Sequence, residues 1–395
     1  MRILLVYKNF PPVIGGVERY LSLLTTGLTQ TGIDVDILTT WDKHTTREEQ
    51  QPHISIYKAG HWGHISSAPL SLPFFRIFEQ LARESDLIHL NIPYPPADLA
   101  YLISAYQKPL VITYHADIVR QRISGRLYRP FLRQILKKAH QIIVSSQAYI
   151  DTSLQLQPYS NKCVVIPISI PVEAYKATPA ITARAHQYRH EYADMPLLLF
   201  IGKMRHYKGV DILIRAMDQI SSSHLLLVGD GPLLSTWRSL ARSSPAHRRI
   251  HFLGELSEMD KIACLHAADI FILPSINRAE SWGMVLLEAM ACSLPLISTE
   301  LGTGTSVINE HNSTGLVIPP NDSSALAQTV NYLLEHPQLR KNLGQNGRIR
   351  CENYFHVHQM IQQTIEVYTH VVQKPLYQNS RAVWNNSRPD LNPLP

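Results

Sequence analysis

The sequence predicts an α/β protein with two doubly wound, Rossmann-like domains of parallel sheet. At 395 residues the chain is longer than the roughly 250–300 residues that one hydrophobic core supports. Short runs rich in Leu, Ile and Val alternate with amphipathic stretches of helical length, as in a parallel sheet covered by helices. This alternation stops once, in an irregular polar segment, and then restarts. Two domains of the same kind are therefore expected.

Composition places the chain among ordinary globular proteins. Hydrophobic residues make up 45% and charged residues 17%, which excludes disordered and collagen-like classes. The apolar run after Met1 is too short for a signal peptide or a membrane span and is interpreted as a first strand. Cys163, Cys264, Cys292 and Cys351 lack CxxC or Cys/His metal spacing. We expect reduced, buried thiols in a cytoplasmic protein rather than a disulfide or zinc framework.

The first domain is expected at residues 1–170. An amphipathic helix at 17–30 follows its first strand. The strands of this domain are expected at residues 2–7, 34–39, 87–90, 110–113 and 141–144. Residues 171–196 hold three prolines and a His/Arg cluster, so they are predicted to be a linker.

The second domain is expected at residues 197–350, where the alternation returns. Its strands are expected at residues 197–201, 225–228, 250–253, 270–273 and 294–298. Residues 351–372 have the pattern of an amphipathic terminal helix, and 373–395, rich in Pro, Asn and Ser, are predicted to be a mobile tail. Sheets of this kind bind ligands beyond the carboxyl ends of their strands, so the site is expected in a cleft between the domains.

Two glycines, Gly15 and Gly16, separate the first strand from its helix. They let the backbone turn sharply, and the helix N-terminus that follows offers N–H groups to an anion. The spacing is not that of G-x-G-x-x-G, so a plain strand-to-helix turn is an equally good interpretation.

The second domain opens with a strand and the basic loop GKMRHYKG. Lys203, Arg205 and Lys208 repel one another there unless a polyanion binds, and a helix predicted at 209–220 adds its N-terminus. A solvated basic loop is the alternative. Gly229 lies in the following GDGP turn, whose proline at the first helical position favours a structural role.

The stretch from Glu280 to Glu288 places two carboxylates eight positions apart. Gly283 marks the start of a helix, whose first N–H groups, at Gly283, Met284 and Val285, are oriented for an anion. Carboxylates accept hydrogen bonds from the vicinal hydroxyls of a sugar or ribose. Taken separately, the two glutamates would also fit an ordinary helix start.

Five motifs together resemble the retaining, nucleotide-sugar-dependent glycosyltransferases of family 4. They are the Gly-Gly turn, a His-x-Asp at His115 and Asp117, the G-[RK]-x4-KG loop, GDGP and E-x7-E. The similarity extends over residues 1–369. It implies the GT-B fold, in which an acceptor-binding N-terminal domain and a donor-binding C-terminal domain face each other and the C-terminal helix crosses back to the first domain.

The resemblance also implies roles for individual residues. Lys203 and Lys208, with help from Arg205, would bind the donor diphosphate, and the N–H groups at 283–285 would cradle phosphate. Glu280 would bind the donor sugar, Glu288 the ribose, and Gly15, Gly16 and Gly229 would approach the donor through their backbone. The catalytic set would be His115, Glu280 and Lys208, with His115 positioning or polarising the reaction centre.

The same resemblance implies chemistry without a metal. Cations and a helix N-terminus can stabilise the charge that grows on a departing diphosphate. No cofactor is expected beyond the nucleotide-sugar co-substrate, and the DxD at Asp34 and Asp36 is interpreted as structural. Three positions depart from the family pattern: Lys203 replaces an Arg, IPISIP near 166–171 replaces Asn-Gly, and Ser293 replaces a Gly.

The net charge of +6 favours an anionic partner, and residues 120–138 contain seven basic residues and no acidic one. This segment is either a solvated helix face or a patch for anionic lipid headgroups or the acceptor. The arginines assigned to the patch are Arg120, Arg122, Arg126, Arg129 and Arg133. No nucleic-acid motif is present, so peripheral binding to the inner face of the cytoplasmic membrane is the preferred interpretation.

These expectations describe a retaining hexosyltransferase that builds surface polysaccharide, such as lipopolysaccharide, or glycolipid. Its acceptor would be a glycan or polyprenyl-linked lipid. GDP-mannose is slightly favoured over a UDP-sugar, because residues 300–308 resemble those of mannosyltransferase-like members, and the base is expected near 252–255. A dinucleotide-dependent oxidoreductase, which would need a glycine fingerprint, and a non-catalytic sugar-nucleotide-binding protein are the alternatives.

Overall fold

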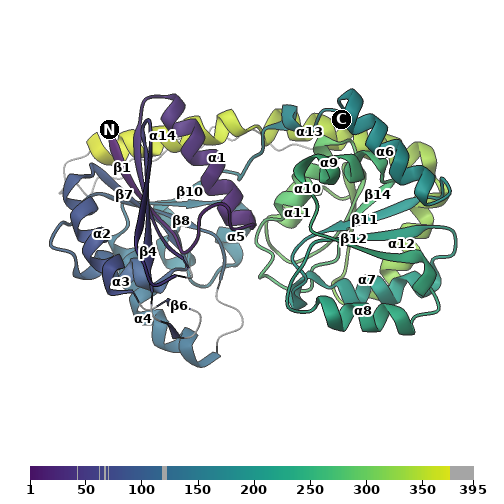
Figure 1. Cartoon of the computed structure of the whole chain (residues 1–395), viewed down its shortest axis with the longest axis horizontal. Helices are drawn as coiled ribbons and strands as arrows, with labels where there is room; N and C mark the ends of the chain where they lie inside the picture. Colours follow the sequence, from purple (N-terminus) through teal and green to yellow (C-terminus); the bar gives the residue numbers. More distant parts are fainter. Residues whose placement is uncertain (42, 62, 66–67, 70, 118–121, 374–395) are drawn as a thin grey trace. The chain divides into compact units, whose positions relative to one another are not determined.

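A computed structural model describes residues 1–41, 43–61, 63–65, 68–69, 71–117 and 122–373 of the chain (Figure 1). The chain divides into two compact units, and the boundary is crossed twice. Unit 1 combines Met1–Pro167 with the C-terminal segment from His358 onward, and unit 2 is Ile168–Val357. The tail predicted at 373–395 lies outside the described residues except for Gln373, which ends a helix.

Unit 1 is built on an eight-stranded sheet in the order β10-β9-β8-β7-β1-β2-β4-β3. All neighbours are parallel except β3, which runs antiparallel to β4 at the edge. The strands are β1 (Arg2–Val6), β2 (Asp34–Trp41), β3 (Arg47–Gln51), β4 (Ile54–Gly60), β7 (Leu87–Ile92), β8 (Leu110–Tyr114), β9 (Gln141–Val144) and β10 (Cys163–Val165); β5 (His64–Ile65) and β6 (Ala68–Pro69) form a separate hairpin.

Helices cover both faces of this sheet, as Figure 1 shows, with α1 and α14 on one face and α2, α3 and α4 on the other. The helices are α1 (Gly16–Gln30), α2 (Leu72–Glu84), α3 (Pro95–Ile103), α4 (Arg122–Lys138), α5 (Gln147–Thr152), the 3-10 helix η1 (Gln157–Lys162) and α14 (Val357–Gln373). The strands β1, β7 and β8 are buried along nearly their whole length, which explains their continuous apolar runs.

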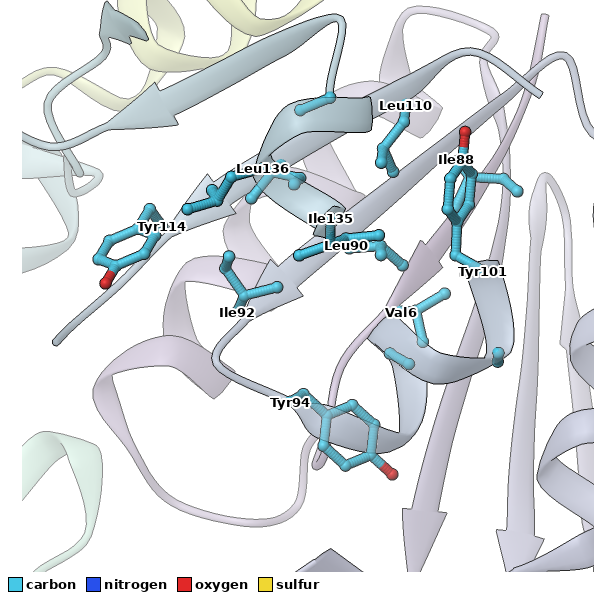
Figure 2. Packing of buried hydrophobic residues seen from close by; sticks show 14 of the residues in the cluster. Val6, Ile88, Leu90, Ile92, Tyr94, Tyr101, Leu110, Tyr114, Ile135 and Leu136 are labelled. Atoms are coloured by element: carbon cyan, nitrogen blue, oxygen red, sulfur yellow. The ribbon is translucent and has the colours of Figure 1, made fainter. Parts of the chain in front are cut away.

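The core of unit 1 forms where α3 and α4 pack on the central strands. Figure 2 shows side chains from β1, β7, β8, α3 and α4 pointing toward one another. The labelled members are Val6, Ile88, Leu90, Ile92, Tyr94, Tyr101, Leu110, Tyr114, Ile135 and Leu136. This packing fixes the carboxyl ends of β7 and β8, where a candidate site residue lies.

The C-terminal helix α14 is part of unit 1. Ile361 packs so closely on Gly27 of α1 that a Cβ added there would lie 2.0 Å from its Cδ1 atom. Tyr368 Oη is 2.6 Å from Nδ1 of His89, a buried residue of β7. The predicted single helix at 351–372 is instead the end of α13 (Pro337–Tyr354) followed, after two residues, by α14.

Unit 2 has a six-stranded parallel sheet in the order β13-β12-β11-β14-β15-β16. In Figure 1, α7 and α8 cover one face of the sheet, and α9 and α10 cover the other. The strands are β11 (Leu197–Ile201), β12 (His224–Val228), β13 (Ile250–Gly254), β14 (Ile270–Leu273), β15 (Leu296–Thr299) and β16 (Gly315–Ile318). The helices are α6 (Pro179–Glu191), α7 (Val210–Ala216), α8 (Leu234–Ser243), α9 (Glu258–Ala267), α10 (Met284–Ala291), α11 (Thr305–Ile308), α12 (Ser323–Glu335) and α13, with 3-10 helices η2 (Val172–Tyr175), η3 (His206–Lys208), η4 (Met217–Gln219) and η5 (His247–Arg249).

The segment 171–196 differs from the predicted linker, because it contains η2 and α6 and belongs to unit 2. Thr178 caps α6 by accepting a hydrogen bond from the Ile181 N–H, and Pro179 starts the helix. Arg184 of α6 pairs with Asp260 of α9 at 2.8 Å. The buried stripe of α6 is narrow, so its polar composition masked the helical pattern. The predicted helix 209–220 likewise divides into α7 and η4.

The two aspartates of the DxD motif lie at the amino end of β2. Asp36 accepts hydrogen bonds from Nε and Nη2 of Arg2, at 2.6 and 3.2 Å, and Asp34 Oδ1 is 2.7 Å from His53 Nδ1. Ligand sites of parallel sheets form at the opposite, carboxyl ends of the strands. These contacts agree with a structural role for both residues.

The fold class predicted from the sequence is confirmed, since both units are helix-covered parallel sheets. Among the described residues, no helix combines the length and the apolar character that crossing a membrane requires.

Candidate functional site

A buried ion pair connects two loops at the carboxyl edge of the unit 2 sheet. Lys208, in the loop after β11, places Nζ 2.5 Å from Oε2 of Glu280, in the loop after β14. Only 7% of Lys208 and 6% of Glu280 are exposed. Burial by itself would lower the pKa of Lys208, but the Glu280 carboxylate more than offsets this, so its pKa is raised. Lys208 is therefore a cation at neutral pH.

Two hydroxyl groups hold Glu280 in place. Ser275 Oγ donates to the same carboxylate oxygen at 2.9 Å, and Thr303 Oγ1 donates to the Glu280 backbone carbonyl at 2.8 Å. Ser275 and Thr303 are fully buried. Neither was given a role in the sequence analysis. Thr303 lies within the segment 300–308, but nothing in that segment or around Ser275 indicates that these hydroxyl groups contact Glu280.

Glycines allow these loops to approach one another closely. Gly209, at φ 66°, has its Cα so near the Pro274 carbonyl oxygen that a Cβ would lie 2.0 Å from it. Gly229 has φ 123°, and a Cβ added there would lie 2.2 Å from the Gly202 carbonyl oxygen. These contacts join the loops after β11, β12 and β14, and they give Gly229 a packing role.

The other two cations of the loop are more accessible. Lys203 is half-buried and Arg205 is exposed, and within the described residues neither side chain forms an ion pair. Arg205 lies close enough to Lys208 to oppose its positive charge. The loop thus presents one buried, paired cation and two open ones, the charge arrangement that a diphosphate would neutralise.

Glu288 lies in the second turn of α10 and is 5% exposed. Its Oε2 is 3.0 Å from Nζ of Lys261, which comes from the neighbouring helix α9. Burial opposes the charge on Lys261, but Glu288 and then Glu258 outweigh it, so the pKa of Lys261 is raised. Sequence reasoning did not find Lys261, because nothing in the first turn of α9 indicates that it reaches α10.

The start of α10 is available to an anion. Its N-cap is Gly283, at φ 88°, which has no side chain that could cap the N–H groups of the first turn, where Met284 and Val285 lie. Trp282 fixes the preceding loop by donating from Nε1 to the Ile168 carbonyl at 2.9 Å, and Gly304 packs on its ring. Trp282 is a further residue that sequence reasoning missed.

His115 lies at the carboxyl end of β8 in unit 1. Its Nε2 is 2.9 Å from Oδ1 of Asn91, and its ring contacts those of Tyr7 and Tyr20. Because the Asn91 amide nitrogen points to the Val6 carbonyl at 3.5 Å, Oδ1 is the acceptor and Nε2 carries the hydrogen. Burial lowers the pKa of His115 to about 3, so the imidazole is neutral at physiological pH.

The remaining motif residues of unit 1 have structural partners. Asp117 Oδ1 accepts hydrogen bonds from Tyr114 Oη at 2.8 Å and Ser153 Oγ at 2.7 Å. Gly15 is the N-cap of α1, and a Cβ there would lie 2.0 Å from Oε2 of Glu18. Gly16 is the first residue of α1. Unit 1 thus presents a neutral histidine and a helix N-terminus.

The predicted basic patch lies on and before α4. Arg120 is outside the described residues, and Arg122 and Arg126 lie in the first turns of α4, where only the backbone is described. Arg129 and Arg133 are exposed, as is Phe131 at 46%. The opposite face of α4 is buried in the core through Tyr128, Leu132, Ile135 and Leu136. The described part of α4 is therefore amphipathic, with Arg129 and Arg133 one turn apart on one exposed side.

No metal-binding cluster is found in the described part of the chain, where no three His, Cys, Asp or Glu side chains are grouped to hold an ion.

Two family models match the chain, one on each half. Residues 14–174 match the model described as Glycosyltransferase Family 4, and residues 183–350 match Glycosyl transferases group 1. The chain is 36% identical to D-rhamnosyltransferase WbpZ of Pseudomonas aeruginosa, over 90% of this chain and 92% of that protein. It is 35% identical to O-antigen chain mannosyltransferase C of Escherichia coli, over 93% and 98%.

A solved structure has the same fold. Sucrose-phosphate synthase from Thermosynechococcus elongatus superimposes with a TM-score of 0.81 and 24% identity, covering 94% of this chain and 98% of that one.

Proposed function

Because the chain belongs to the glycosyltransferases of family 4, with a C-terminal half of the group 1 type, we propose that it is a retaining, metal-independent hexosyltransferase that uses GDP-mannose. A UDP-sugar is the second candidate donor. The acceptor is a glycan or a polyprenyl-linked lipid in the synthesis of surface polysaccharide or glycolipid. The observation that carries this proposal is the buried Lys208–Glu280 pair, in the loops at the carboxyl edge of the unit 2 sheet.

In this proposal each part of the donor has its own partners. Lys203, Arg205 and Lys208, with the N-terminus of α10, bind the diphosphate. Glu280 accepts hydrogen bonds from hydroxyls of the hexose, and Glu288 from those of the ribose. The spacing supports this order, since Glu280 directly contacts the lysine of the diphosphate loop, whereas Glu288 lies further along α10.

The transfer exchanges one bond at C1 of the hexose for another. The bond from C1 to the diphosphate oxygen breaks with its electron pair, and the acceptor oxygen bonds to C1 from the same face. The acceptor proton passes to the departing diphosphate. Its growing negative charge is stabilised by cations and backbone N–H groups that are already in place.

His115 acts in this proposal as a neutral hydrogen-bonding group. The low pKa that burial imposes means that it does not carry a positive charge near pH 7. Asn91 accepts a hydrogen bond from the Nε2–H, which makes Nδ1 the acceptor nitrogen of the neutral ring. This arrangement suits positioning of a hydroxyl group better than proton storage.

The mannose preference is supported by the E. coli relative, which is a mannosyltransferase and aligns with nearly the whole chain. A thermal-shift screen with GDP-, UDP-, ADP- and TDP-sugars tests it, because a donor at 100 times its dissociation constant adds about 2.7 kcal/mol to native stability. The largest shift is expected with GDP-mannose. Stabilisation by NAD(H) alone would instead favour an oxidoreductase, and donor binding without diphosphate release would favour a non-catalytic binding protein.

Substitutions of the two glutamates are expected to affect different measurements, GDP binding for Glu288 and diphosphate release for Glu280. Glu288→Gln should weaken GDP binding about tenfold or more, since hydrogen bonds to a charged group contribute about 1.5–3 kcal/mol. Glu280→Gln should leave GDP binding within about threefold, because GDP lacks the hexose, while diphosphate release from the full donor falls. Calorimetric titration with GDP and a diphosphate-release assay measure the two effects.

Glu352 is an exposed residue of α13 that pairs with Arg348, and Glu352→Gln is the matched control. It should change neither GDP affinity nor diphosphate release. Equal GDP affinities for Glu288→Gln and wild type would remove the assigned role of Glu288.

We also propose that α4 binds anionic membrane surfaces through Arg129 and Arg133, which lie one turn apart on the same exposed side of the helix. Each arginine near such a surface contributes about 1 kcal/mol. The double variant Arg129→Gln/Arg133→Gln is therefore expected to bind vesicles of anionic lipid about 30-fold more weakly in co-sedimentation. The double variant Arg238→Gln/Arg242→Gln, which removes two exposed arginines from α8, is the matched control. Equal losses in the two double variants would show attraction by net charge and not by α4.

A further inference from the structure

Each carboxylate of the candidate donor site is paired with a different lysine. Lys208 contacts Glu280 and Lys261 contacts Glu288, at 2.5 and 3.0 Å. The first lysine belongs to the conspicuous basic loop, and the second comes from the first turn of α9, outside every motif recognised in the sequence. The question is whether Lys261 binds the donor or acts through Glu288.

The surroundings of Lys261 make it a poor ligand for phosphate. Its Nζ lies between two carboxylates, 3.0 Å from Oε2 of Glu288 and 3.1 Å from Oε2 of Glu258. The side chain is 17% exposed, and its ammonium group is 5.9 Å from the ring centroid of Tyr175. Two anions already compensate its single charge, whereas Lys208 has one carboxylate and two further cations on its own loop.

The Glu288 carboxylate, in turn, depends on a cation. Its side chain is 6% exposed, and a buried charge is costly unless an opposite charge or hydrogen bonds compensate it. Each oxygen of a carboxylate accepts hydrogen bonds, so the group matches two hydroxyl groups that both donate only when it is correctly oriented. The Lys261 ammonium group, at 3.0 Å, compensates the charge and restricts the rotamer of the Glu288 side chain.

We propose that Lys261 is a positioning residue that holds the Glu288 carboxylate in the orientation in which it accepts hydrogen bonds from the two ribose hydroxyls of the donor nucleotide. This inference rests on the proposed function, in which Glu288 binds the ribose. It adds a residue from α9 to the donor site and predicts that this residue governs the preference for ribose over its deoxy form.

The test compares nucleotides with and without the ribose hydroxyls. Wild type, Lys261→Met and Lys261→Arg are titrated calorimetrically with GDP, UDP and the 2′,3′-dideoxy form of each. Of GDP and UDP, the nucleotide that wild type binds more tightly should bind at least tenfold more tightly than its own dideoxy form, as expected for hydrogen bonds to a charged acceptor. Lys261→Met should lose most of that ratio while binding the dideoxy form as wild type does. Lys261→Arg should restore the ratio in part.

Arg184→Met is the matched control, because Arg184 pairs with Asp260, the neighbour of Lys261 on α9, and does not contact Glu288. It should preserve the ribose preference. If Lys261→Met fails to fold, Lys261→Gln provides the second neutral variant. Should the wild-type ratio persist in the neutral Lys261 variants, or should both nucleotide forms weaken equally, the inference is wrong while the proposed function stands. Wild type that binds neither GDP nor UDP would overturn the proposed function itself.

Discussion

Lys208→Met is expected to lower kcat/KM for diphosphate release by about 10²–10³-fold, the usual cost of removing one group that stabilises transition-state charge. It should also destabilise the protein by about 3–5 kcal/mol, because Glu280 would remain buried without its cation. Kinetic assays and urea unfolding followed by circular dichroism measure the two effects separately.

A second variant separates stability from catalysis. Lys208→Met/Glu280→Gln leaves no unpaired charge, so most of the lost stability should return while turnover stays low. Lys203→Met is the control, since Lys203 is half-buried and forms no ion pair within the described residues. It should reduce donor affinity with little change in stability. Near-wild-type turnover in Lys208→Met would remove this lysine from the catalytic set.

Unit 1 is expected to lose stability steeply in mild acid. Burial lowers the pKa of both His89 and His115 to about 3, and electrostatic repulsion from His115 contributes to the low pKa of His89. Between about pH 6.5 and pH 3 these histidines are protonated in the unfolded chain but neutral in the folded protein. Their contribution to the free energy of unfolding is therefore complete above pH 6.5 and falls as pH decreases toward 3. Each costs up to about 1.4 kcal/mol per pH unit.

Asp98 has the opposite effect on how the stability of unit 1 changes with pH. Burial raises its pKa to about 7 against a usual value of 3.8, despite the hydrogen bond from Tyr128. Its contribution is complete below pH 3.8 and is lost as pH rises through 7. From pH 6 to pH 5 the three residues together should therefore cost about 1.4 kcal/mol, two protons taken up on unfolding less one released.

Asp98→Asn exposes this balance. It removes the proton that Asp98 releases on unfolding, so the free energy of unfolding should fall by about 2.7 kcal/mol between pH 6 and pH 5 in urea unfolding experiments. Asp151→Asn changes an exposed aspartate of α5 and is the control, which should match wild type. Identical pH slopes for Asp98→Asn and wild type would contradict the assigned protonation of Asp98.

Much of the fold was predictable because buried parallel strands have a strong local signal. The strand predicted at 141–144 coincides with β9, and that at 197–201 with β11. The strands missed in the two main sheets are β3, β4, β10 and β16, and the two-residue strands β5 and β6 of the separate hairpin were missed as well. The first is entirely polar, the third has three residues, and the fourth has four, so none shows a long apolar run. The polar helix α6 was taken for a linker for the same reason.

The sequence by itself determined the fold class and the family, because these depend on local pattern and on the order of motifs, and its fixed spacing predicted Glu280 and Glu288 as site residues. Only the tertiary structure decided which cation serves which carboxylate. Lys261 is 27 residues from Glu288 and Lys208 is 72 from Glu280, and a spacing in sequence carries no distance once helices and crossovers intervene. The buried state of His115 was decided in the same way, since its low pKa comes from packing against Tyr7, Tyr20 and Asn91.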